Sequence, residues 1–302
     1  MASFITLVVS MLLGVGLQRV KTIPDNAHST LGTLILYVPM PAICLLTLPE
    51  LEWNISLFGL AAVCWIIFFL AWYLFSSLGR KYNWDKELIA CLILTTGFCN
   101  TAFVGFPVID ALYGQEALKH AIFLDQAGSF LIVSTFGIWL AISYSSGKLR
   151  KRILFRKILF FPPFIAFILA LVGGFLGWRA KGDIRVVLEN LAALLTPMAL
   201  ISVGLQLKWS DVRAQLRFLT LGLIYKLLLA PLIIFSVYFL MDVPKNILNV
   251  AVMEAAMAPM ITSSILAASH NLRPKLAGMM VGVGVPLSFI TLGLWYYLLK
   301  LV

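Results

Sequence analysis

Two stretches of this 302-residue chain decide its fold: LILTTGFCNTAFVGFPVIDALYG at 92–114 and VAVMEAAMAPMITSSILAASHN at 250–271. Each is a long apolar run with a proline and several polar side chains in its middle. Such Gly/Pro interruptions are typical of a membrane helix that breaks where it lines a cavity or faces protein. At an offset of 158 residues, Thr96 of the first stretch pairs with Glu254 of the second. The two breaks therefore belong to equivalent parts of a repeat.

The composition places these stretches in a membrane protein. Apolar residues make up 61% of the chain and charged residues 12%, with a mean hydropathy of +0.98. A soluble domain carries about 25% charged residues, so a soluble fold is excluded. A spanning helix needs about 20 apolar residues, and ten such segments fill the chain without leaving a soluble catalytic domain. We expect spans near 2–18, 29–47, 54–78, 88–111, 118–145, 161–178, 186–206, 215–241, 246–268 and 275–301.

Further matches support an internal repeat. SFITLVVSMLLGVG at 3–16 aligns with PFIAFILALVGGFL at 163–176, and YVPMPAI at 37–43 aligns with LTPMALI at 195–201. Near the ends of the two halves, TFGIW at 135–139 aligns with TLGLW at 291–295. Because each half holds five spans, the second copy must enter the membrane from the opposite side. Inverted repeats of this kind are typical of secondary transporters that work by alternating access.

The sequence thus predicts an all-α polytopic membrane protein with ten transmembrane helices in two inverted five-helix repeats. Helices 4 and 9 are expected to be broken and to cross each other. The first repeat spans 1–145, a short basic cytoplasmic loop spans 146–160, and the second repeat spans 161–302.

The basic residues predict the orientation. The net charge is +10, and sixteen Lys and Arg residues lie in one set of alternate loops against six, Lys119 among them, in the other set. The positive-inside rule places the sixteen in the cytoplasm and both termini outside, on the periplasmic face of the inner (cell) membrane. The charge therefore reflects orientation in a lipid bilayer and gives no indication of nucleic acid. The basic run at 145–157 is interpreted as a topology determinant, with an anionic-lipid contact as the alternative.

The polar residues beside the breaks are the candidate site. They are Asn100, Thr101 and Pro107 in the first stretch, and Pro259, Thr262 and Ser263 in the second. Half-helix N-termini carry partial positive charge that suits an anionic substrate, and C-terminal carbonyls suit a cation. These residues are thus expected to bind substrate where the two repeats meet.

Three ionisable residues are expected inside spans, where a charge costs at least about 2.5–3.5 kcal/mol. Glu254 directly precedes the second break, and Asp125 lies about two turns into span 5, where it could also be an interfacial carboxylate. Lys226 in span 8 could pair with a carboxylate, attract the substrate, or extend to the membrane surface. Glu254 and Asp125, with the Asn100 amide, form a candidate Na⁺ or proton site. We expect no cofactor other than such a coupling ion.

Four segments in this order resemble the auxin efflux carrier family: YVPMPAICLL, GFCNTAFVGFPVIDALYG, TPMALISVGLQL and the stretch from Glu254 to Asn271. The resemblance includes the family's short bacterial members, described as malate or malonate permeases. It implies transport of small carboxylates, with Asn100 contacting the substrate carboxylate and Val38 in the substrate pocket. EAAM at 254–257 is also similar to the glutamate-bearing crossover of the bile acid sodium symporters, which implies a Na⁺ role for Glu254.

We therefore expect a secondary active transporter of a small carboxylate, coupled to Na⁺ or H⁺. An uncoupled uniporter or efflux carrier and a passive anion channel are the alternatives. An enzyme is not expected, because HExxH and GxSxG are absent and the three histidines lie near span ends. A homodimer, the substrate's identity and the direction of transport stay open.

Overall fold

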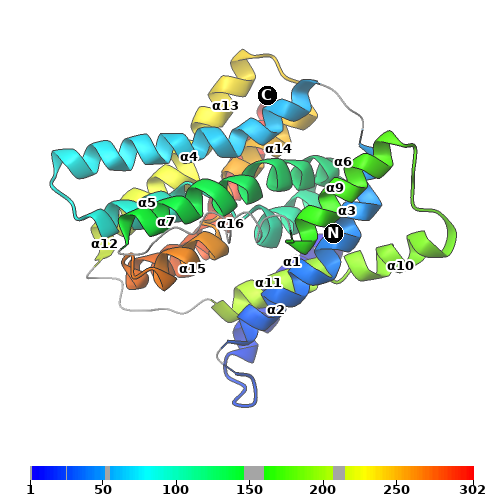
Figure 1. The fold of residues 1–302 in the computed structure, drawn as a ribbon, viewed down its shortest axis with the longest axis horizontal. Coiled ribbons are helices and arrows are strands. Elements are labelled where there is room, and N and C mark those ends of the chain that lie inside the picture. Colours follow the sequence, from blue (N-terminus) through cyan, green and yellow to red (C-terminus); the bar gives the residue numbers. More distant parts are fainter. Residues whose placement is uncertain (1, 25, 52–54, 146–159, 207–214) are drawn as a thin grey trace. The chain divides into compact units, whose positions relative to one another are not determined.

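The computed structural model describes residues 2–24, 26–51, 55–145, 160–206 and 215–302, and these are almost entirely helical (Figure 1). The contacts divide the chain into two compact units. The first comprises 1–54, 102–126 and 151–207, and the second comprises 55–101, 127–150 and 208–302. Each unit combines segments of both predicted repeats, so the compact units are not the repeats themselves. The inverted topology stays a prediction from sequence.

In the first unit, α1 and α2 pack along α11, and α3 packs against α9 and α10. Proline begins two of these helices, since its fixed φ suits the first helical turn: Pro39 in α3 and Pro162 in α9. The helices are α1 (Ala2–Leu17), α2 (Ala27–Tyr37), α3 (Pro39–Thr47), α6 (Phe106–Leu124), α9 (Pro162–Phe175), α10 (Gly182–Ala192) and α11 (Leu195–Gln206).

The second unit packs α4 against α5 and α14, and α15 against α5 and α16. Its helices are α4 (Ile55–Lys81), α5 (Lys86–Thr96), α7 (Ile138–Tyr144), α12 (Leu216–Ile224), α13 (Ala230–Leu240), α14 (Lys245–Ala255), α15 (Ile261–Ser269) and α16 (Pro274–Leu301). A π-helical turn, Tyr225–Leu229, joins α12 to α13 and carries the buried Lys226. Such π-turns often occur at functional sites.

Within the described ranges, six helical segments are long and apolar enough to cross a membrane: Ala27–Glu50, Leu57–Lys81, Thr101–Tyr144, Gly182–Leu205, Leu216–Leu240 and Pro274–Leu301. This confirms an all-helical membrane protein. Two other expected spans are the shorter apolar helices Val8–Leu17 and Pro162–Phe175. Expected spans 4 and 5 meet inside α6 at Gly114, whose φ of 79° interrupts the helix.

The structure also breaks spans 2 and 7, for which the sequence predicts continuous helices. The first break is at Val38, where φ is −123° and ψ −74° between α2 and α3. The second separates α10 from α11 at residues 193 and 194. Most of the basic run at 145–157 lies outside the described residues.

Candidate functional site

The two predicted helix breaks lie side by side in the second unit. Helix α5 ends at Thr96 and α14 ends at Ala255, and each is followed by a short non-helical segment. Cys99 and Pro259 form an isolated antiparallel bridge between these segments. The Asn100 N–H donates to Ala258 O at 3.0 Å, and the Met260 N–H donates to Phe98 O at 3.3 Å. The backbone groups that leave their helices therefore bind each other, as a break inside a membrane requires.

Asn100 places a hydrogen-bond donor at this junction. Its side chain is 1% exposed, and Nδ2 has no hydrogen-bond acceptor among the described residues. A buried donor left unsatisfied costs about 1–3 kcal/mol, so the amide is suited to bind an acceptor brought by a ligand. The neighbouring Thr101 is fully buried, and its hydroxyl lies 3.5 Å from Ser129 Oγ.

Lys226 reaches the same junction from the π-turn between α12 and α13. Its side chain is completely buried, and Nζ donates to Ala255 O at 2.7 Å and to Cys99 Sγ at 3.1 Å. The alternative that Lys226 extends to the membrane surface is therefore wrong. The ammonium instead binds the last carbonyl of α14, where the helix dipole is negative.

The remaining predicted residues of this unit line the α14–α15 break. Glu254 is fully buried in the last turn of α14, one residue before the carbonyl that Lys226 binds. Pro259 is buried and Thr262 is exposed. The hydroxyl of Ser263 donates to Met260 O at 3.0 Å in the first turn of α15.

The other three predicted residues belong to the first unit. Val38 lies between α2 and α3 and is 37% exposed. Pro107 stands in the first turn of α6, the half-helix that follows the first break. Asp125 is buried, and its carboxylate accepts a hydrogen bond of 2.7 Å from Gln126 Nε2.

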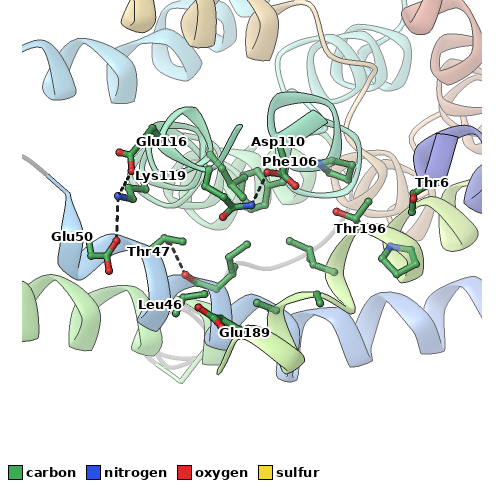
Figure 2. Close-up of a pocket in the computed structure, with 18 of the residues that line it drawn as sticks. Thr6, Leu46, Thr47, Glu50, Phe106, Asp110, Glu116, Lys119, Glu189 and Thr196 are labelled. Carbon is green, nitrogen blue, oxygen red and sulfur yellow. Dashed lines mark hydrogen bonds and ion pairs between the residues drawn. The ribbon is translucent and has the colours of Figure 1, made fainter. Parts of the chain in front are cut away.

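Pro107 also lines a cavity of about 590 Å³ in the first unit (Figure 2). This volume suits a small organic molecule, since ligand pockets measure about 300–1,000 Å³. Polar side chains from α1, α6 and α11 face it, namely Thr6, Asp110 and Thr196. Val38 does not line this cavity.

A network of ion pairs on one side of the cavity was not predicted from the sequence. Glu50 lies 3.3 Å from Lys119 Nζ and 3.1 Å from Arg185 Nη1, which joins α6 and α10 through one carboxylate. The Lys119 side chain is 9% exposed and also binds Glu116 at 2.7 Å. Figure 2 draws Lys119 between Glu50 and Glu116. The expectation that Lys119 is a loop residue is wrong, because α6 continues through it. Its spacing of three residues from Glu116 was the available signal.

Among the described residues, no group of three or more His, Cys, Asp or Glu side chains could hold a metal ion. The predicted Na⁺ ligands come from both units, with Asn100 and Glu254 in one and Asp125 in the other. The candidate Na⁺ site therefore stays a prediction.

Apolar spanning segments with paired breaks are features of a multi-pass membrane transporter. Comparison with known proteins supports this class: residues 1–296 match the family model described as membrane transport protein. The chain belongs to that family, in agreement with the resemblance to auxin efflux carriers. It is a transporter and not an enzyme.

Two archaeal relatives cover nearly the whole chain. One is an uncharacterized transporter of Methanothermobacter thermautotrophicus, 27% identical over 96% of this chain and 95% of the relative. The other is an uncharacterized transporter of Methanocaldococcus jannaschii, 24% identical over 98% of both chains. Neither description names a substrate.

Proposed function

We propose that the protein is a secondary carrier that moves a small organic anion across the cell membrane by alternating access. The observation that carries the proposal is the junction of the two helix breaks, where the buried Asn100 amide lacks an acceptor among the described residues. A substrate carboxylate would supply that acceptor. The helix dipole places further partial positive charge at the start of α15, directly after the second break.

In this proposal the substrate is a carboxylate of the malate or malonate class. It binds through Asn100 and Thr101 and through the first turn of α15, which holds Thr262 and Ser263. Pro259 keeps the second break open, because it cannot continue the hydrogen bonding of a helix. From the sequence, Val38 and Pro107 remain candidate substrate contacts, and Glu254 and Asp125 remain candidate groups for coupling transport to Na⁺ or H⁺.

Substrate screening and counterflow test the proposal in sequence. Thermal denaturation of the purified protein with malate, malonate and indole-3-acetate selects a stabilising acid. Proteoliposomes preloaded with that acid should then accumulate its radiolabelled form, and the uptake should saturate. A passive channel would give no counterflow. If counterflow is absent, the protein is not a carrier for that acid.

Replacing Asn100 by Ala should weaken binding of the selected acid about 10–100-fold, because a hydrogen bond to a charged group is worth about 1.5–3 kcal/mol. Counterflow in the variant should fall accordingly. Asn249→Ala is the matched control, since Asn249 is a partly buried amide within α14, away from the break. Wild-type transport by Asn100→Ala would refute the assignment of the site.

A further inference from the structure

Lys226 occupies the position that a broken helix offers to a coupling cation. The amides that follow Val252, Met253 and Glu254 satisfy those carbonyls, with Ala256 N–H donating to the first two and Met257 N–H to the third. The next carbonyl, Ala255 O, receives the Lys226 ammonium at 2.7 Å. The C-terminal end of α14 therefore already holds one positive charge.

The ammonium is closed off from solvent and binds both broken segments. Its side chain is completely buried, and its second hydrogen-bond partner is the thiol of Cys99, at 3.1 Å. Cys99 precedes Asn100 and belongs to the bridge between the breaks. Lys226 thus connects the end of α14 with the break that follows α5. A cation shared by the two breaks would make the same connection.

We propose that the Lys226 ammonium is a built-in replacement for a coupling Na⁺ at the crossover, so that this junction forms and binds substrate without Na⁺. A second cation at Ala255 O would lie close to the ammonium in a low-dielectric interior, where like charges repel strongly. The inference rests on the proposed function and narrows it, because it removes Na⁺ as the coupling ion and leaves H⁺, carried by Glu254 and Asp125.

The test measures Na⁺ binding to the purified full-length protein without substrate. Thermal denaturation is followed while NaCl replaces choline chloride at constant ionic strength. The wild-type melting temperature should not depend on Na⁺. A saturable rise with Na⁺ would overturn the proposal, because a ligand that binds the folded state stabilises it. As no substrate is present, the result is independent of the Asn100 experiment.

Variants test whether Lys226 is what excludes Na⁺. Lys226→Met vacates Ala255 O, so its melting temperature should rise with NaCl until the site is filled. Lys226→Arg keeps the charge and should stay insensitive. Lys245→Met, at an exposed lysine that begins α14, is the matched control and should also be insensitive.

A folded Lys226→Met protein that ignores Na⁺ would contradict the replacement role. Recovery of that variant only from Na⁺-containing buffers would support the role. If the variant is recovered from neither buffer, a saturable rise of the wild-type melting temperature with Na⁺ would still overturn the proposal.

Discussion

At the scale of single residues, Asp85 connects the starts of two helices in the second unit. Its carboxylate accepts the Leu88 N–H at 2.7 Å, which caps α5, and Arg273, the residue before α16, binds the same carboxylate. Burial raises the pKa of Asp85, but the hydrogen bonds from Arg273 and the Leu88 N–H more than offset this effect. The pKa of Asp85 therefore lies below its ordinary value.

Asp85→Asn should destabilise the protein at neutral pH. In acid, the difference in stability between the variant and the wild type should disappear. A carboxyl whose pKa is lowered by folding contributes stability above its unfolded pKa, about 3.9, and loses it as pH falls through the folded pKa. Because asparagine also caps helices and the ion pair is largely exposed, the loss at pH 7 should be about 0.5 kcal/mol. Thermal denaturation from pH 7 to pH 3 should show the difference from wild type shrinking below about pH 4.

Asp242→Asn is the control for this experiment, since Asp242 is an exposed loop residue whose left-handed backbone (φ 51°) suits asparagine. Its denaturation curves should follow those of wild type at each pH. A constant difference between Asp85→Asn and wild type across the pH range would contradict the ion-pair explanation.

Residue identity predicted charge inside spans better than it predicted contacts. The sequence placed Lys226 and Glu254 in the interior correctly, because a charged residue within a long apolar stretch is easily recognised. It left the partner of Lys226 open, since that partner is a backbone carbonyl, Ala255 O, made available by a helix end. No side-chain pattern reports such an acceptor. Lys119 was misplaced because a helical segment whose lysine pairs with glutamates contains the same charged residues as a solvent-exposed loop.

At the scale of elements, the crossing of α1 and α11 depends on two glycines. A Cβ added at Gly14 would lie 2.9 Å from the Gly204 Cα, and one added at Gly204 would lie 2.8 Å from the Gly14 Cα. Small residues at such crossings let two helix backbones approach closely inside a membrane. This crossing joins the first helix of one predicted repeat to the second span of the other.

Gly204→Ala should push the two helices apart and destabilise the first unit by about 1–3 kcal/mol, the usual cost of overpacking. The apparent melting temperature in detergent should fall. Gly16→Ala is the matched control on α1, because a Cβ there meets nothing within 4 Å. Since alanine favours helix over glycine, Gly16→Ala should be neutral or stabilising. Equal effects of the two substitutions would show that the close crossing is not what matters.

Element positions were predicted best where proline and polar residues coincide. The breaks after Thr96 and Ala255 occur where the sequence indicated them. The break at Val38 was not predicted, although Pro39 follows it, because a proline inside a span is also compatible with a simple kink. The boundary between spans 4 and 5 at Gly114 is set by a backbone φ of 79°, and the amino-acid composition does not reveal a backbone angle.

At the scale of the whole molecule, the inverted repeat makes a prediction that single helices cannot. Lys21 and Lys181 are both exposed and lie 160 residues apart, at equivalent positions after the first span of each half. A parallel repeat would place them on the same side of the membrane, and an inverted repeat places them on opposite sides. Loop charge assigns Lys21 to the cytoplasm and Lys181 to the outside.

Lys21→Cys and Lys181→Cys, made separately, should therefore react differently with a membrane-impermeant maleimide. Lys181→Cys should label in intact cells, and Lys21→Cys only after the membrane is opened. The wild-type chain is its own control, since its four cysteines, Cys44, Cys64, Cys91 and Cys99, are all buried. Labelling of both variants in intact cells would exclude the inverted repeat. Alternating access at this junction would then lose its physical basis. Two halves of opposite orientation are what allow one site to open to either side of the membrane.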